Sequence, residues 1–155
     1  MKAEDIMTRV VRACRANDSL EHAAQILWEA DIGCLPVLDE RLHPIAMITD
    51  RDIAMAAFFR GLPLKDLRVE TAMSRTLTRC RTDTDLLDLE YLMQCAQVRR
   101  IPVVTPTGEI AGIVTLTDLV RAASAQPQQR LPGLVRTIRA ISERRVPGLS
   151  EAAAE

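Results

Sequence analysis

The chain has 155 residues and 48% hydrophobic side chains, enough for one domain or for two small units that share a core. Aromatic residues make up only 3%, which argues against a stacking platform for single-stranded nucleic acid. The formal net charge of -1 excludes a global field that would recruit nucleic acid or a membrane surface.

Several classes of protein lack their usual sequence signals here. No apolar run is long enough to span a bilayer, and the charged N-terminal segment has no signal-peptide core, so a cytoplasmic location is expected. The four cysteines show no C-x-x-C spacing and are interpreted as small buried side chains. Because His22 and His43 have no ligand-type neighbours at metal-binding spacing and no nucleophile motif occurs, we predict neither a metal site nor an enzyme.

The chain contains an internal repeat at an offset of 66 residues. Residues 5–57 align without a gap on residues 71–123, with 12 identities in 53 pairs, where roughly 3 are expected from average composition. Because a single duplicate seldom buries its apolar face alone, the two copies are expected to pack on each other. The identical pairs include Met7 with Met73, Cys14 with Cys80, Pro36 with Pro102, Thr49 with Thr115, and Asp52 with Asp118.

Each copy is predicted to have the order β-α-β-β-α. The first copy is expected to contain a strand at 10–14, a helix capped by Asp18 or Ser19 that runs to about Ala30, a strand at 34–38, a turn at 39–41, a strand at 45–48, and a helix from Thr49 to about Phe59. The second copy is expected to contain a strand at 76–80, a helix after Thr84 and Asp85, a strand at 101–104, a turn at 105–108, a strand at 110–114, and a helix from Thr115 to about Ala123.

Proline interrupts the apolar strand in each copy, at Pro36 and Pro102. Since proline has no backbone N–H to donate, this strand is expected at a sheet edge, or to begin at the proline.

The repeat stops after Ala123. Residues 124–129 have the composition of a linker. A helix is then predicted over 131–146, with an apolar stripe and a basic face, and residues 150–155 are expected to be frayed. Packing on the pair or on a dimer mate is favoured for this helix, and contact with an acidic partner or nucleic acid is the alternative. The stripe is Leu134, Val135, Ile138 and Ile141, and the basic face is Arg130, Arg136, Arg139, Arg144 and Arg145.

Both copies resemble a known family, the CBS domain. The first copy resembles it in the segments DIMTR, DSLEHAAQILWEADIGCLPVLDE and IAMITDRDIA, and the second in TAMSR and QVRRIPVVTPTGEIAGIVTLTDLV. The resemblance covers residues 5–123. It implies an α/β (α+β) fold of two tandem repeats packed as a pseudo-two-fold pair, with CBS domains at 1–62 and 63–124 and a linker and C-terminal amphipathic helix at 125–155.

The resemblance also implies a regulatory function. Clefts between the copies of such pairs bind adenosine-containing ligands such as AMP, ADP, ATP or S-adenosylmethionine, and the pairs associate further into dimers. We therefore expect a homodimer that signals ligand occupancy to an unknown effector protein. The alternatives are a ligand-free dimerisation scaffold, and a nucleic-acid-associated protein that acts through the Arg-rich C-terminal helix.

The residues Thr115, Leu116, Thr117 and Asp118 stand at a strand-to-helix junction. A carboxylate can accept both hydroxyls of a ribose, and a helix N-terminus favours a phosphate group. The same spacing of Thr115 and Asp118 also fits a helix capping box. The resemblance favours the ligand-binding interpretation for the second copy.

The family's binding positions carry over residue by residue. The ribose-binding carboxylates match Asp52 and Asp118, with hydroxyls at Thr49, Thr115 and Thr117. The positions that frame the adenine match Val11, Arg12, Leu77 and Thr78. The stretches before the proline strands are Ile32, Gly33 and Cys34, and Val98, Arg99 and Arg100. Arg51, Arg99 and Arg100 have the reach for a phosphate, and a solvated surface position is the alternative for each.

The two clefts are not expected to be equivalent. Gly112 leaves room for a close backbone approach, whereas the first copy has Ala46 there, and Gly33 is matched by the bulky Arg99. We favour the cleft of Thr115 and Asp118 as the binding site.

Overall fold

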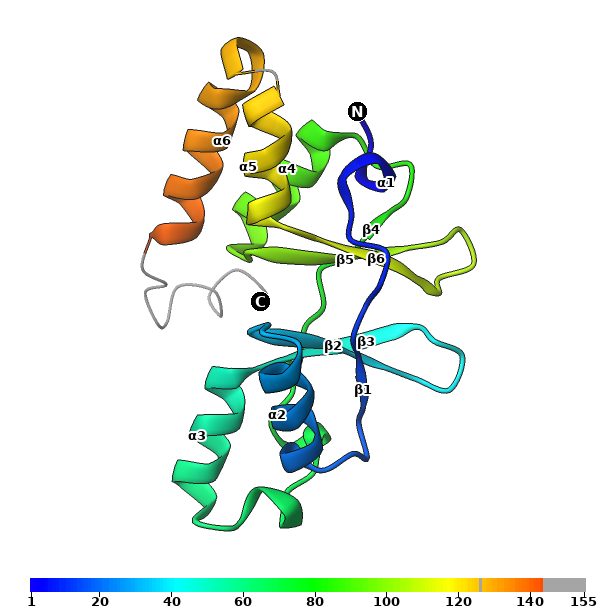
Figure 1. The fold of residues 1–155 in the computed structure, drawn as a ribbon, viewed down its shortest axis with the longest axis vertical. Coiled ribbons are helices and arrows are strands. Elements are labelled where there is room, and N and C mark those ends of the chain that lie inside the picture. Colours follow the sequence, from blue (N-terminus) through cyan, green and yellow to red (C-terminus); the bar gives the residue numbers. More distant parts are fainter. Residues whose placement is uncertain (126, 144–155) are drawn as a thin grey trace, which may run out of the picture.

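A computed structural model describes residues 1–125 and 127–143 (Figure 1). Its two three-stranded sheets have the orders β1-β2-β3 and β4-β5-β6. The strands are β1 (Cys14–Arg15), β2 (Cys34–Leu38), β3 (Pro44–Thr49), β4 (Cys80–Arg81), β5 (Arg100–Val104) and β6 (Ile110–Thr115). The helices are α1 (Ala3–Ile6), α2 (Leu20–Glu29), α3 (Asp50–Arg60), α4 (Leu86–Ala96), α5 (Leu116–Ala125) and α6 (Pro127–Ser142), with 3-10 turns η1 (Leu64–Asp66) and η2 (Val69–Thr71).

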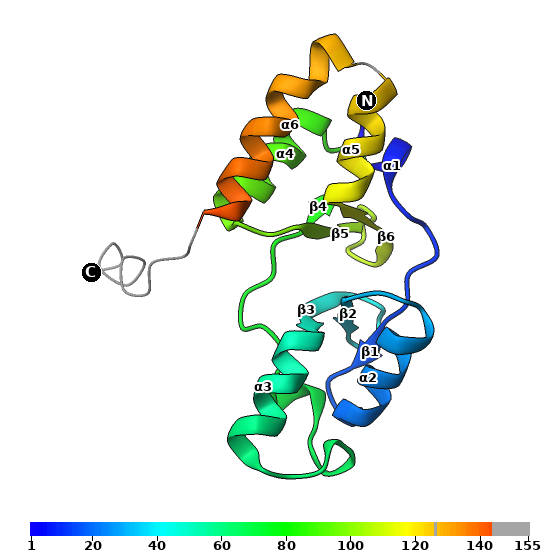
Figure 2. The same ribbon diagram turned by 60° about the vertical axis from the view of Figure 1, so that its left-hand side comes forward.

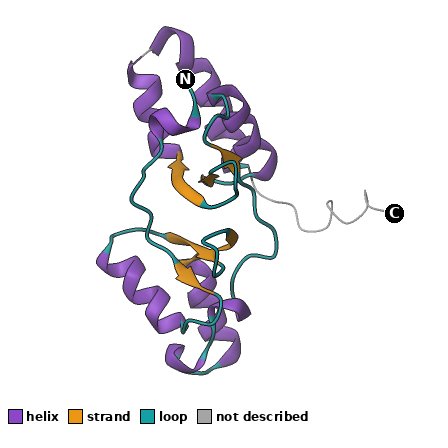
Figure 3. Ribbon diagram, turned by 90° about the vertical axis from the view of Figure 1, so that its right-hand side faces the viewer, coloured by secondary structure: helices purple, strands orange, loops and turns teal. Residues whose placement is uncertain are grey.

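The two sheets face each other at the middle of the molecule, and the helices lie outside them at its two ends (Figures 1 and 3). Strand pairing repeats at the offset of 66. Cys14 pairs with Val37 in a parallel ladder, and Cys80 pairs with Val103 in the same way. The predicted mixed fold of two packed repeats is therefore confirmed.

The prediction of an edge position for the proline strands is wrong. β2 and β5 are the middle strands of their sheets. Pro36 lies opposite Met47, and the backbone N–H and C=O of Met47 bond to Ser74 instead, at 2.9 and 2.8 Å. The pair is thus of the non-hydrogen-bonded kind, and the proline nitrogen points toward β1. Because the β1 ladder begins only opposite Val37, no donor is required at Pro36.

The helix starts follow the predicted caps. The Ser19 hydroxyl accepts a hydrogen bond from the His22 N–H at 3.1 Å and begins α2. Thr49 and Asp52 form a reciprocal capping box at the start of α3. These side chains satisfy backbone N–H groups that a helix N-terminus leaves without partners.

The first strand of each copy is shorter than predicted. Of the expected segments 10–14 and 76–80, only Cys14 and Cys80 belong to strands. The chain before Cys14 instead crosses to the other copy, where Thr8 pairs with Ile113. These residues connect the two sheets and do not extend β1.

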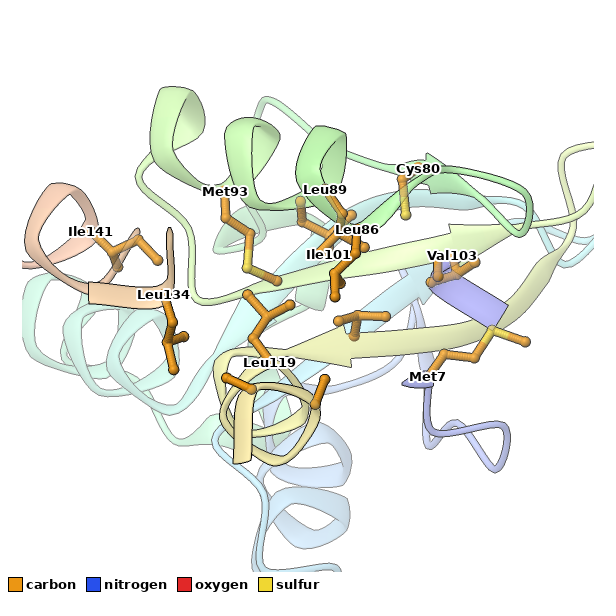
Figure 4. Close-up of a cluster of buried hydrophobic side chains, with 14 residues drawn as sticks. Met7, Cys80, Leu86, Leu89, Met93, Ile101, Val103, Leu119, Leu134 and Ile141 are labelled. Atoms are coloured by element: carbon orange, nitrogen blue, oxygen red, sulfur yellow. The ribbon is translucent and has the colours of Figure 1, made fainter. Parts of the chain in front are cut away.

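The two copies exchange their N-terminal segments. Ala3 and Met7 are buried in the core of the second copy, where Figure 4 shows Met7 among its side chains. Leu67 and Val69 are buried in the core of the first copy. The hydrophobic core of each copy is therefore completed by residues that precede the other copy's first strand in the sequence.

Helix α6 differs from the prediction in two ways. It begins at Pro127, so the described residues of the predicted linker are helical, because proline is tolerated in the first turn of a helix. It packs on α4 and α5 (Figure 2) through Leu134, Thr137 and Ile141. Val135 and Ile138 are exposed and do not join the buried stripe.

The contacts of α6 with α4 and α5 agree with the favoured prediction that this helix packs on the pair. Arg144, Arg145 and the end of the predicted helix at Val146 lie outside the described residues, as does the predicted frayed segment 150–155. No helix in the described part of the chain is long and apolar enough to cross a bilayer.

Candidate functional site

A pocket of about 590 Å³ lies between the two copies. The first copy contributes the segments that precede β1 and β2, and the second copy contributes the start of β5, the end of β6 and the start of α5. Its lining residues are Thr8, Val10, Val11, Arg12, Ala30, Asp31, Ile32, Gly33, Cys34, Pro36, Arg100, Ile113, Thr115 and Thr117.

The pocket brings together predicted residues from both copies. Eight of the candidate positions line it: Val11, Arg12, Ile32, Gly33, Cys34, Arg100, Thr115 and Thr117. The stretch predicted to frame an adenine, at Val11 and Arg12, thus lines the same pocket as the hydroxyl-bearing helix start of the other copy.

The remaining lining residues were missed by the sequence analysis. Val10 and Asp31 directly flank predicted site residues, Ala30 precedes Asp31, and Thr8, Pro36 and Ile113 belong to the motifs that carry the family resemblance. Motif position was therefore a usable signal for Pro36 and Ile113. Thr8 also lies in a quoted motif, but its place in the pocket depends on the crossing of the N-terminal segment, which the repeat does not reveal.

Other predicted residues do not line this pocket. Thr49, Arg51, Leu77, Thr78, Val98 and Arg99 are the positions that correspond, 66 residues away, to Thr115, Thr117, Val11, Arg12, Ile32 and Gly33. They are the positions that the repeat assigns to a counterpart cleft on the pseudo-symmetric side. The structure thereby sorts the candidate residues into two sets, and their binding roles stay predictions.

Two guanidinium groups give the pocket positive charge. Arg12 comes from the first copy and Arg100 from the second. Arg100 reaches across the boundary between the copies, because its Nη1 would lie 3.7 Å from a Cβ placed on Gly33. Asp31 is the one carboxylate among the lining residues.

The Cys34 side chain is nearly enclosed beside Arg100. Burial raises the pKa of the Cys34 thiol above its ordinary value, and a hydrogen bond and the charge of Arg100 oppose this shift. A thiol with a raised pKa stays neutral near pH 7. Cys34 therefore lines the pocket with a small uncharged side chain.

Backbone hydrogen bonds join the first residue of α3 and of α5 to the segment that precedes β2 or β5 in the same copy. The Asp50 N–H donates to the Gly33 carbonyl at 3.3 Å, and the Leu116 N–H donates to the Arg99 carbonyl at 2.8 Å. One free N–H of α3 and one of α5 are thus satisfied inside the protein.

The carboxylate of Asp118 is only 5% exposed and is not among the residues that line the pocket. Its Oδ2 accepts hydrogen bonds from the Thr115 N–H at 2.8 Å and the Thr115 hydroxyl at 2.7 Å. Its Oδ1 accepts from Arg121 at 3.3 Å. Asp118 in this arrangement caps α5 and orients Thr115, and a ribose-binding role stays a prediction.

Asp52 makes the same contacts with Thr49 in the first copy, at 2.9 and 2.7 Å. The capping-box alternative therefore describes the geometry of both copies. The pocket instead receives the hydroxyl-bearing residues Thr115 and Thr117.

Gly112 does allow a close approach, but the approaching atoms belong to the protein. A Cβ at Gly112 would lie 2.5 Å from Sδ of Met7 and 2.9 Å from the carbonyl oxygen of Thr8. The close approach that Gly112 permits is therefore made by the N-terminal segment of the chain. It marks where the exchanged N-terminal segment crosses β6.

Among the described residues, no group of three or more His, Cys, Asp or Glu side chains is placed to hold a metal ion.

The comparisons with known proteins agree with this architecture. The family model of the CBS domain matches residues 3–58 and 64–125. The chain therefore belongs to the CBS domain family and carries two tandem copies. It is 32% identical over 133 residues to the uncharacterized protein YlbB of Bacillus subtilis, covering 83% of this chain and 85% of that protein.

Two solved structures with similar folds contain adenosine compounds. The CBS domain pair of protein MJ0100, in complex with 5'-methylthioadenosine and S-adenosyl-L-methionine, has a TM-score of 0.71 at 26% identity. CBSX2 in complex with AMP has a TM-score of 0.71 at 27% identity. Each match covers 81% of this chain and 98% of the other.

Proposed function

We propose that the pocket between the two copies binds an adenosine-containing ligand and that the chain is a regulatory module without catalytic activity. The observation that carries this proposal is the composition of the lining, in which both copies supply apolar walls, hydroxyls and a guanidinium. Such a concave site with a few convergent polar groups is typical of small-molecule binding. The complexes of MJ0100 and CBSX2 support the ligand class.

The charges favour a phosphorylated ligand, which is AMP, ADP or ATP rather than S-adenosylmethionine. Arg12 and Arg100 face the pocket against a single carboxylate, that of Asp31. Guanidinium groups bind phosphate oxygens strongly, whereas they repel the positive sulfonium of S-adenosylmethionine. The α5 N-terminus at Thr115 and Thr117 adds hydroxyls and a positive dipole end.

A ligand in this pocket is suited to regulation because it contacts both copies at once. It stabilises the relative orientation of the copies to which it binds more tightly, and its differential affinity sets the size of the shift. An effector protein that contacts both copies, or a dimer mate, would register this shift.

Calorimetry of the full chain with AMP, ADP, ATP and S-adenosylmethionine tests the proposal. The nucleotides are expected to bind more tightly than S-adenosylmethionine. Arg100→Ala is expected to weaken nucleotide binding at least about tenfold, because a hydrogen bond to a charged group contributes roughly 1.5–3 kcal/mol. Its matched control is the neighbouring Arg99→Ala, which removes a guanidinium outside the pocket and keeps the carbonyl that holds Leu116.

Absence of binding by all four compounds at millimolar concentration would contradict the proposal and favour a ligand-free scaffold. A larger loss of affinity for Arg99→Ala than for Arg100→Ala would move the site to the counterpart cleft. Tightest binding of S-adenosylmethionine would contradict the preference for phosphate.

A further inference from the structure

The carboxylate of Asp31 lines the pocket between the two copies without a partner in the protein. Asp31 is the only acidic residue among those that line this pocket. Among residues 1–125 and 127–143, its side chain forms no hydrogen bond and no ion pair. An ionised carboxylate accepts several hydrogen bonds, and those of Asp31 are therefore available to a bound molecule.

Asp118 offers a contrast, because its carboxylate is already engaged inside the protein. Its two oxygens accept hydrogen bonds from Thr115 and from Arg121, and it does not line the pocket. A ligand could use Asp118 only by displacing these bonds. Of the two carboxylates, only that of Asp31 lies in the pocket and is open to a new hydrogen bond.

The end of α2 holds the backbone of Asp31 in one conformation. The Asp31 N–H donates to the Trp28 carbonyl at 3.3 Å, and the Ile32 N–H donates to the Leu27 carbonyl at 3.0 Å. These two bonds form a Schellman motif, in which the residue after the helix cap is left-handed. The φ of Asp31 is accordingly 51°. A fixed backbone lowers the entropy cost of binding through this side chain.

Glycine is the usual residue at this point of a Schellman motif, because it adopts the left-handed conformation without a steric penalty. The chain instead has Asp31, whose side chain forms no hydrogen bond with the described residues. Backbone strain of this kind clusters at binding sites. The strain at Asp31 therefore indicates a use for its carboxylate outside the fold.

The repeat offers a direct comparison at Gln97, which corresponds to Asp31 in the second copy and has a φ of 49°. The Gln97 side chain has a structural use, because its amide donates to the Ala140 carbonyl of α6 at 3.2 Å. The same backbone position thus carries an amide bound to α6 in one copy and a carboxylate in the pocket in the other.

A carboxylate in this pocket discriminates between the groups of a nucleotide. It repels phosphate, which Arg12 and Arg100 attract. It attracts hydroxyl groups, and its two oxygens can each accept one of the two neighbouring hydroxyls of a ribose. The ribose is therefore the part of an adenosine nucleotide that Asp31 fits best.

We propose that Asp31 accepts the ribose hydroxyls of the nucleotide, in place of Asp118, and that it selects ribonucleotides over deoxyribonucleotides. This assignment rests on the proposed nucleotide binding and specifies its chemistry. Because the second copy has Gln97 at the same position, bound to α6, ribose recognition through this carboxylate belongs to one cleft only.

Calorimetry of the full chain with AMP, 2′-deoxy-AMP and 3′-deoxy-AMP tests the assignment. The unchanged chain is expected to bind each deoxynucleotide at least about tenfold more weakly than AMP, because a hydrogen bond to a charged group is lost. Asp31→Gly is expected to bind all three within about twofold of one another, since the loss of the carboxylate and the loss of the hydroxyl remove the same interaction.

The fold is expected to tolerate both variants at this position. Glycine suits the left-handed conformation, so the thermal unfolding temperature of Asp31→Gly should be unchanged or higher. Asp31→Asn repeats the test with a neutral side chain of the same shape, which also tolerates this conformation. It should reduce the preference for AMP, because its amide offers one uncharged acceptor.

Asp50→Asn is the matched control for charge. Asp50 does not line the pocket, although its Oδ2 would lie 3.5 Å from a Cβ on Gly33, and Nη1 of Arg100 would lie 3.7 Å from the same point. This variant removes the same charge near the same guanidinium. It should change the affinities for AMP and for the deoxynucleotides by one common factor and keep the tenfold preference.

Four outcomes would overturn the assignment. A preference for AMP that persists in Asp31→Gly would give the ribose to another acceptor, and a preference that Asp50→Asn also abolishes would make it a general effect of charge. Asp31→Gly that loses discrimination against inosine monophosphate, but not against the deoxynucleotides, would place the adenine amine at Asp31. Equal binding of AMP and the deoxynucleotides by the unchanged chain would refute the assignment alone, whereas absence of AMP binding would refute the proposed function with it.

Discussion

The two copies of the repeat have nearly the same inner structure and very different outer surfaces. Strand order, register and the irregularity between the last two residues of the proline strand recur 66 residues apart. Outside the sheets, α4 and α5 are covered by α6, while α2 and α3 expose Trp28, Phe58 and Phe59. The comparison shows that the facing sheets restrict the sequence of both copies in the same way, whereas the outer surface of the second copy is adapted to α6.

The largest effect is expected from the covering helix. Leu134 is 4% exposed and belongs to the core of the second copy. Leu134→Ala should lower the free energy of unfolding by about 2–4 kcal/mol, as for other buried leucines, measured by denaturant titration. The neighbouring Val135→Ala removes an exposed side chain and should change it by less than about 0.5 kcal/mol. Similar small effects of both variants would mean that α6 contributes little to the second copy.

A smaller effect is expected where the exchanged segments cross the sheets. Gly112→Ala should destabilise the fold by about 1–3 kcal/mol, because the new Cβ would overlap Met7 and the backbone of Thr8. The reverse change in the first copy, Ala46→Gly, should cost about 1 kcal/mol through backbone entropy and lost packing. Thermal unfolding of both variants gives the comparison. A neutral Gly112→Ala would show that the crossing segment can move away from β6.

The smallest effect concerns the buried thiols, which report on each copy separately. Burial raises the pKa of Cys14 to about 12 and that of Cys80 to about 11. Cys95 is exposed and should react first with a thiol reagent. Cys14 should follow before Cys80, because α6 covers only the second copy and local opening of the first copy is easier. Mass spectrometry of partly labelled protein gives the order, and faster labelling of Cys80 would reverse the inferred stabilities.

The same pKa values set the sign of a pH dependence. Unfolded thiols lose their protons near pH 9, whereas folded Cys14 and Cys80 keep theirs to about 12 and 11. The unfolded state therefore binds fewer protons in this range, and stability falls as the pH rises above about 9. Below about pH 9 both thiols are protonated in the folded and in the unfolded state, so their full contribution to the free energy of unfolding is present. Replacing both by alanine should flatten the fall, which denaturation at pH 8 and pH 10 can measure.

Local sequence signals predicted most of the secondary structure. Ser19 and Thr49 begin their helices because their hydroxyls accept backbone N–H groups a few residues on. Gly108, with a φ of 96°, closes the predicted second hairpin. Of the candidate site, the residues near β2 and at the start of α5 line one pocket, because the repeat and the motifs locate both ends of that contact.

The errors share one physical origin, which is contact between parts distant in sequence. The proline strand is central because β1 and β3 pair with its two sides, and Pro36 fits there because Met47 directs its backbone to Ser74. The described residues of the predicted linker belong to helices, and α6 packs on α4 and α5.

The sequence by itself determined that the chain is a duplication, which elements each copy contains and which family it belongs to, because hydrophobic period, caps and turns act over a few residues. The tertiary structure decided how the copies are joined. It placed Met7 in the second core, Leu67 in the first, and Arg12 and Arg100 around one pocket. These arrangements depend on packing and charge across the boundary between the copies, where no local pattern specifies which residues meet.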